Sequence, residues 1–290
     1  MGVSADEVLR QGAVAWLNWR AGRLAVPDLS DAQLMGMNLR GADLHDVNLR
    51  RSNLADAKLV AVNLTGATLN NAILDRADLV DARLRSIETI NCRAVGADFR
   101  RADFGAANLM GSNFRAADLR DANLSGVNAI SIDLTSARLK GADLDRVKFH
   151  RATLCYTDLV ETNLAHADLS QAILTEAELG LAHLYRANFT SAQLRRAHLV
   201  GAYGVLANFD RANLTDADLA WANLAKTSWI GTILAGANFR GANLTGADLT
   251  GADLSGANLT GANLSYANLR QAKISGVNFT DTLLTGVLRG

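Results

Sequence analysis

The side chains that could do chemistry in this 290-residue chain are few and dispersed. Its five histidines never fall at the short spacings of a metal site: His45, His150, His166, His183 and His198. The two cysteines, Cys92 and Cys155, are too few for a disulfide framework or a four-thiolate metal site. The glycine-rich stretch 236–263 lacks the Lys-Ser/Thr pair of a phosphate-binding loop. We therefore expect no enzymatic activity, no metal and no cofactor.

The charge of the chain is balanced, with 29 Lys and Arg against 29 Asp and Glu. This balance disfavours a generally basic nucleic-acid binder. No apolar run reaches the roughly 18 residues that a membrane span needs. The segment Met1–Arg10 carries two acids and no apolar stretch, which is unlike a signal peptide. We expect a soluble, cytoplasmic protein.

A five-residue repeat organises most of the chain. Its clearest copies read Ala-Asn/Asp-Leu and two variable residues, as in 242–246 and 247–251. Every fifth residue from Leu29 to Leu284 gives 52 central positions without a gap, and 46 of them hold Leu or Phe. Because side chains alternate on extended backbone and five is odd, each unit must contain a corner that keeps the next Leu inside. A chain that turns every five residues winds into a solenoid, and its only proline, Pro27, stands at the entrance to the first unit.

These A(D/N)LXX units resemble those of the pentapeptide-repeat family over residues 27–286. The resemblance implies an all-β solenoid, a right-handed quadrilateral β-helix with four units per coil and about 13 coils, with Leu and Phe ladders inside. We divide the chain into an N-terminal helical cap at 1–26, the β-helix at 27–286 and a C-terminal tail at 287–290.

Both ends of a solenoid expose apolar side chains that need a cover. Ser4 and Glu7 fit a capping box, and apolar residues recur at helical spacing after them. This pattern predicts one helix of about four or five turns within 4–23 that covers the first coil with Trp16 or Trp19. At the other end we predict a homodimer through the last coil, with four dimerisation residues: Leu283, Leu284, Val287 and Leu288.

One column of residues 20 apart, which four units per coil would stack on one outer face, is mainly acidic. It predicts a partner-binding acidic ridge: Asp78, Asp98, Asp118, Asp158, Glu178 and Asp218. Like charges stacked about 4.8 Å apart repel, so such a ridge needs compensation or a use. Arg100 and Arg120 flank its first half, whereas its second half has apolar neighbours. Neutralisation of the whole ridge by adjacent columns is the alternative.

A second candidate surface lies in an irregular region, where Gly204 takes the place of a central Leu. Aromatic and cationic residues gather there into a predicted aromatic patch: Tyr203, Leu206, Trp221, Lys226 and Trp229. An exposed aromatic beside a cation is typical of protein interfaces. The alternative for Trp229 is that it fills space in the core.

The resemblance also implies a function, because members of this family imitate B-DNA and bind DNA gyrase or topoisomerase IV, which protects the enzyme from inhibitors. It implies a non-enzymatic module that binds a protein partner through the acidic ridge, confers antibiotic resistance, and contacts neither nucleic acid nor membrane. The zero net charge argues against imitation of DNA. The alternative function is a general protein-interaction scaffold in bacterial regulation or stress response.

Overall fold

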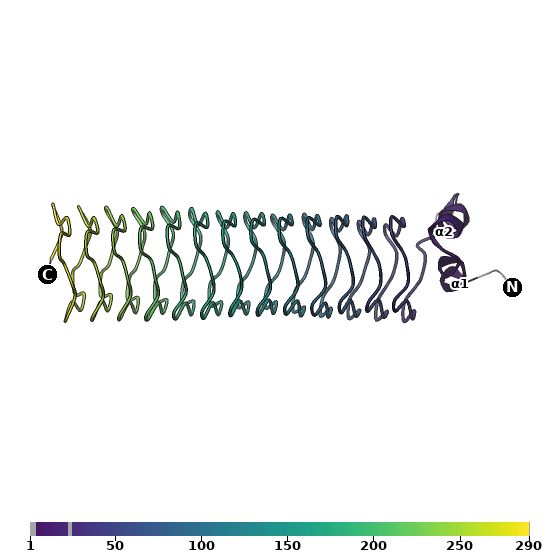
Figure 1. Cartoon of the computed structure of the whole chain (residues 1–290), viewed down its shortest axis with the longest axis horizontal. Helices are drawn as coiled ribbons and strands as arrows, with labels where there is room; N and C mark the ends of the chain where they lie inside the picture. Colours follow the sequence, from purple (N-terminus) through teal and green to yellow (C-terminus); the bar gives the residue numbers. More distant parts are fainter. Residues whose placement is uncertain (1–3, 23–24, 290) are drawn as a thin grey trace. The chain divides into compact units, whose positions relative to one another are not determined.

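The computed structural model describes residues 4–22 and 25–289. The chain divides into two compact units, residues 1–143 and 144–290, and each is built from stacked coils (Figure 1). The first unit also carries two helices, α1 (Ala5–Leu9) and α2 (Ala13–Arg20).

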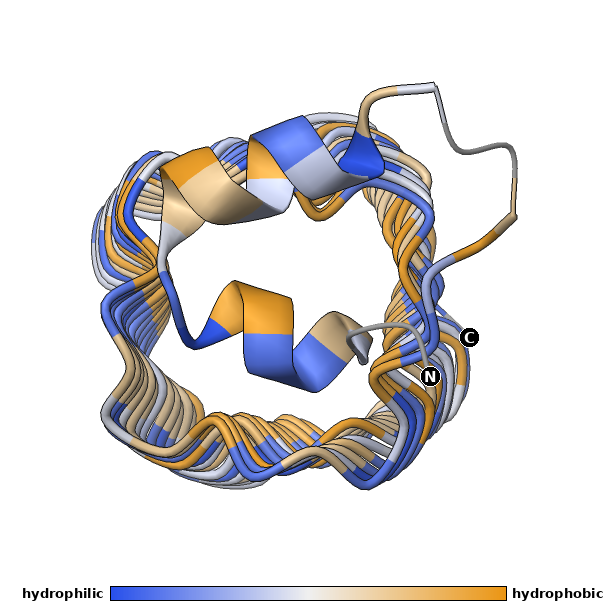
Figure 2. Cartoon of the chain, turned by 90° about the vertical axis from the view of Figure 1, so that its right-hand side faces the viewer, coloured by the Kyte–Doolittle hydropathy of each residue, from blue (hydrophilic) through white to orange (hydrophobic). Residues whose placement is uncertain are grey.

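The coils in both units repeat every 20 residues. Parallel bridges join residues 20 apart, such as Asp78 with Asp98 in the first unit and Glu178 with His198 in the second. Each side of a coil pairs through a single residue, the one before the central Leu, so the described residues contain isolated bridges and no extended strand. Figure 2 looks along the coils and shows their four-sided outline. The predicted four units per coil are therefore present within each unit, and the total of 13 coils stays a prediction.

The corners of the coils explain the last two positions of each repeat. The second residue of each turn lies in the left-handed region, with φ of 60° at Asp31, 61° at Trp221 and 66° at Gly241. Left-handed backbone costs a residue with a Cβ roughly 1–2 kcal/mol, which favours Gly, Asn and Asp there. The corner also reverses the alternation, so the next central Leu points inward again.

The interior consists of the central Leu and Phe side chains and the Ala two residues before them. Aromatic rings compensate for irregular units: Phe99 and Phe114 stack 5.1 Å apart near Ala94, which replaces a central Leu. The irregular unit at Gly204 is filled differently, because the Leu224 side chain leans toward Gly204.

Trp229 belongs to this interior, so its prediction as a surface residue is wrong. It is 0 % exposed and stacks on Phe209 with the ring centroids 4.2 Å apart. Its indole Nε1 donates a hydrogen bond of 2.6 Å to the hydroxyl of Thr227. Trp229 occupies a central position of the repeat, and a large apolar ring at that position points inward as Leu does.

Two helices, rather than one, lie on the first coil (Figure 2). The capping box of Ser4 and Glu7 is confirmed, but the predicted single helix is wrong, because Gly12 with a φ of 104° separates α1 from α2. Side chains of α2, and Arg10 directly after α1, donate to carbonyls at the edge of the first coil, Arg10 to the Gln33 carbonyl at 2.7 Å. Trp16 donates to the Asp43 carbonyl at 2.6 Å and Arg20 to the His45 carbonyl at 2.5 Å. The helices thus satisfy acceptors that a preceding coil would otherwise bind.

Candidate functional site

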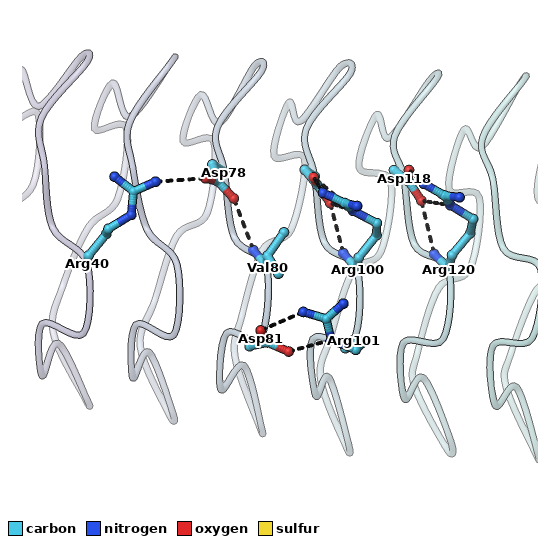
Figure 3. A network of polar contacts seen from close by, with 9 residues as sticks. Arg40, Asp78, Val80, Asp81, Arg100, Arg101, Asp118 and Arg120 are labelled. Atoms are coloured by element: carbon cyan, nitrogen blue, oxygen red, sulfur yellow. Dashed lines mark hydrogen bonds and ion pairs between the residues drawn. The ribbon is translucent and has the colours of Figure 1, made fainter.

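The acids of the predicted ridge stack as expected in the first unit, but they are neutralised. Asp78, Asp98 and Asp118 are bridged in succession (Figure 3). Arg100 pairs with Asp98 and Arg120 with Asp118, both at 2.6 Å. Arg100 and Arg120 each lie two residues after their own aspartate, so these two pairs form within one coil. Asp78 instead pairs with Arg40, two coils earlier, at 3.4 Å, and no row of uncompensated acids is left (Figure 3).

The electrostatics of this region follow from those pairs. Burial alone would raise the pKa of Asp118, but hydrogen bonds from Arg120 overcome that effect and the pKa is lowered. At the neighbouring corner, the Arg101 guanidinium lowers the pKa of Asp81. The carboxylates are therefore held in their charged form by adjacent cations, and the surface potential of these pairs largely cancels.

The ridge of the second unit differs, because its acids have weaker partners. Asp158, Glu178, His198 and Asp218 are bridged in succession. Glu178 contacts His198 at 2.8 Å, and Asp218 accepts hydrogen bonds from the Ala220 backbone and the Asn238 side chain. Among the described residues, no Lys or Arg lies within ion-pair distance of Glu178 or Asp218. This stretch keeps its negative charge.

A shallow hollow lies beside this stretch of the ridge. It has a volume of about 460 Å³ and is lined by Tyr156, Glu176, Glu178, Arg196 and His198. Arg196 pairs with Glu176 at 3.2 Å along one corner of the coils. Within the described part of the chain, no group of three His, Cys, Asp or Glu side chains is arranged to hold a metal ion.

The four remaining residues of the predicted aromatic patch are exposed but do not form one patch. Leu206 and Lys226 stack at one corner of the coils, whereas Trp221 occupies the preceding corner and Tyr203 lies on the side between the two corners. Trp221 is 62 % exposed and Tyr203 is 44 % exposed. The Arg240 guanidinium lies 5.9 Å from the centroid of the Trp221 ring, within the range of a cation–π contact.

Two apolar residues that the sequence analysis missed lie on the same corner as Trp221. Leu181 is 56 % exposed and Val200 is 38 % exposed, and we call Leu181, Val200, Tyr203 and Trp221 the corner patch. A backbone ladder joins their coils: the N–H of Leu181 donates to the Val200 carbonyl at 3.0 Å, and the N–H of Gly201 donates to the Ala220 carbonyl at 2.9 Å. A signal was present in the sequence, since Leu181 and Trp221 are 40 residues apart, two coils of the same column.

Glycines shape the corner patch. Gly201 follows Leu181 on the corner, and a Cβ added to Gly201 would lie 2.9 Å from Leu181 Cδ2. A Cβ added to Gly241 would overlap the Trp221 ring. The large side chains of Leu181 and Trp221 therefore each lean over the glycine of the next coil and lie along the surface.

The last coil leaves the predicted dimerisation residues accessible. Leu283 and Leu288 are exposed, and Leu284 and Val287 are partly exposed. A hollow of about 560 Å³ is lined by residues that include Leu269, Ile274, Phe279 and Leu284.

Cys92 of the first unit is buried, and burial raises the pKa of its thiol to about 12, as expected of an unreactive core cysteine.

Comparisons with known proteins identify the family. A family model described as pentapeptide repeats matches eight copies between residues 28 and 288. HetL, a pentapeptide repeat protein of the cyanobacterium Nostoc involved in the regulation of heterocyst differentiation, is 32% identical over 78% of this chain and 89% of its own, with a TM-score of 0.34. Rfr23, a pentapeptide repeat protein of the cyanobacterium Cyanothece, is 34% identical over 36% of this chain and 60% of its own, with a TM-score of 0.15.

A third solved structure is more distant in sequence. QnrB1, a plasmid-mediated fluoroquinolone resistance protein, is 18% identical over 89% of this chain and 92% of its own, with a TM-score of 0.25. A search of curated proteins finds no match. The described helices include none long and apolar enough to cross a membrane. The repeat register and the family match together place this chain in the pentapeptide-repeat family, whose fold is a right-handed quadrilateral β-helix.

Proposed function

We propose that this chain is a non-enzymatic protein-binding module and that the corner patch of its second unit is the binding surface. The observation that carries the proposal is the exposure of Leu181, Val200, Tyr203 and Trp221 on adjoining coils of a surface whose other outward residues are mainly polar. Protein interfaces are enriched in exposed aromatic and Arg side chains, and Trp is the commonest residue to dominate binding energy. Arg240 beside Trp221 fits that composition.

The regularity of the fold supports a binding role for this surface. Nearly every coil meets the same packing requirement with Leu and Ala inside and polar residues outside, so a large exposed Trp is not needed by the core. The relationship to HetL, which is itself involved in regulation, supports a scaffold role in bacterial regulation.

The experiment is affinity capture with the tagged chain in a lysate of its native host. The wild type, Trp221→Ala and Leu181→Ala are compared, with Tyr266→Ala as the matched control because Tyr266 is an exposed aromatic at another corner. The corner tolerates alanine, as Ala61 and Ala106 already hold that conformation. A partner captured by wild type and Tyr266→Ala but lost from both other variants supports the proposal, and equal capture by all four chains refutes it.

DNA gyrase is the second candidate partner, and the unneutralised acids of the second unit favour it. Imitation of DNA needs a negatively charged face. Glu178 and Asp218 supply such a face in the second unit, whereas Asp98 and Asp118 of the first unit are paired with arginines. The test is a supercoiling assay with and without a fluoroquinolone. Relief of drug inhibition supports this candidate and the expected antibiotic resistance, and unchanged gyrase activity at excess protein removes it.

Two finer expectations accompany the proposal. The homodimer, in which a second copy covers the last coil, stays a prediction, and the accessible Leu283 and Leu288 support it. A monomer mass in light scattering at micromolar concentration would overturn it. A cytoplasmic location also stays a prediction, and fractionation of the native host tests it.

A further inference from the structure

Three residues of the corner patch, Leu181, Val200 and Trp221, lie on the same side of the coils as the acids of the second unit, and Tyr203 lies just beyond the corner. This side comprises residues 156–161, 176–181, 196–201, 216–221 and 236–241. Asp218 accepts a hydrogen bond from Ala220, the residue before Trp221, and Asp158 accepts one from Val160 in the same way. Each acid is therefore held two or three residues, roughly 7–10 Å, from the apolar row beside it.

The side carries a net negative charge. Six acids lie in these segments: Asp158, Glu161, Glu176, Glu178, Asp216 and Asp218. The same segments contain two Lys or Arg residues, Arg196 and Arg240, so their formal charge is −4 when His198 is counted as neutral. A negative row beside an apolar row attracts a partner with the opposite arrangement, a positive row beside an apolar one.

We propose that this side binds a basic amphipathic helix of a partner protein, an inference that rests on the proposed protein-binding function. Apolar residues at i, i+3, i+4 and i+7 lie about 5–6 Å apart along a helix, close to the roughly 4.8 Å between successive coils. A helix laid along the coils would place its apolar stripe on Leu181, Val200 and Trp221. Because a helix is about 10 Å wide, Lys and Arg side chains next to its apolar stripe would lie over Glu178 and Asp218.

The hollow beside the ridge supplies a place for one cationic side chain. Glu176 and Glu178 line it together with the Tyr156 ring, which offers an aromatic face for the aliphatic part of Lys or Arg. Tyr156 is itself more than half exposed. The cation of the partner would compete with Arg196 and His198 for these carboxylates.

The test uses the full chain and a synthetic peptide of about 18 residues, a helix about 27 Å long. Its Leu residues recur at i, i+3, i+4 and i+7, and Lys fills the other positions. Binding is followed by calorimetry and by the emission of the exposed Trp221. We expect saturable binding that weakens about tenfold in Trp221→Ala and several-fold in both Glu178→Gln and Asp218→Asn, with a reduced salt dependence in the two charge variants.

Matched controls separate this recognition from nonspecific attraction. Tyr266→Ala and Asp248→Asn remove an aromatic and a charge from the second unit outside this side, and both are expected to bind as wild type does. A scrambled peptide of the same composition, and one with Glu for Lys, are expected to bind at least tenfold more weakly. Equal binding of the scrambled peptide, or no effect of Trp221→Ala, overturns the inference.

The two proposals fail in different ways. If host proteins depend on Trp221 for capture while the peptide does not bind, the class of partner is wrong and the binding function stands. If neither the peptide nor a host protein depends on Trp221, both proposals are wrong.

Discussion

Trp229 gives a sharp prediction because the repeat itself supplies the natural replacement, Leu. The wild-type ring is fully buried, lies 4.2 Å from the Phe209 ring and meets Phe239 edge-on at 5.9 Å. Trp229→Leu keeps the inward-pointing side chain but removes both aromatic contacts and the hydrogen bond to Thr227. Thr227 keeps its own hydrogen bond to the Leu224 carbonyl, so no buried donor is left unsatisfied by the change.

The magnitude follows from packing. Each aromatic pair contributes about 0.5–1.5 kcal/mol beyond burial. Truncation of a buried Phe or Trp to Ala costs about 3–5 kcal/mol, of which Leu would retain part. We expect Trp229→Leu to lower the free energy of unfolding by about 2–3 kcal/mol, with the loss concentrated in the second unit.

The assay is urea unfolding of wild type and variant followed by circular dichroism, with hydrogen exchange of amides in residues 209–249. Exchange is needed because a solenoid can unfold in parts. Trp221→Leu is the control, since this exposed side chain is expected to change stability by less than about 0.5 kcal/mol. Equal stability of wild type and Trp229→Leu would refute the assignment of Trp229 to the core.

Three further predictions concern pH, reactivity and the corner glycine. Arg51 beside Asp31 and Arg101 beside Asp81 lower the pKa of each carboxyl below its ordinary value of about 3.8. The two ion pairs therefore contribute their full stabilisation above that ordinary pKa, and the contribution is lost as the pH falls through the lower pKa of the folded state. Thermal melts between pH 2 and pH 7 check this, and a melting temperature that is constant below pH 4 contradicts it. Cys92, with its buried thiol, should resist a thiol reagent at pH 8 until the chain is unfolded; rapid labelling of the native protein at Cys92, seen by peptide mass mapping, would show that the site opens. Gly241→Ala should displace the Trp221 ring and shift its emission, and it should lower stability by roughly 1–2 kcal/mol because a residue with a Cβ is strained at a φ of 66°. An unchanged spectrum would mean that the ring does not lie over Gly241.

The fold was largely predictable because one physical requirement repeats along the chain. A Leu every fifth residue must point inward, which predicts the corners, the stacking of residues 20 apart and the buried Ala. The interruption of the helical segment was harder to predict, because Gly12 acts through a backbone angle of 104° that composition does not reveal.

The candidate surfaces were predictable only in part. The column of acids was identified, but its charge depends on rotamers: Arg100 turns back to Asp98 in its own coil, whereas Arg101 reaches Asp81 in the preceding one. Proximity in sequence grouped Trp229 with Trp221, although one occupies a central position and the other a corner. Sorting residues by position within the repeat would have separated them and added Leu181.

The most direct test of the protein-binding surface is photo-crosslinking in the native host. A photoreactive phenylalanine analogue replaces Trp221 in one strain and Tyr266 in another, and both side chains are exposed at corners of the second unit. The account predicts a discrete crosslinked protein from position 221 and none from position 266. No crosslink from position 221, or the same product from both positions, would contradict it.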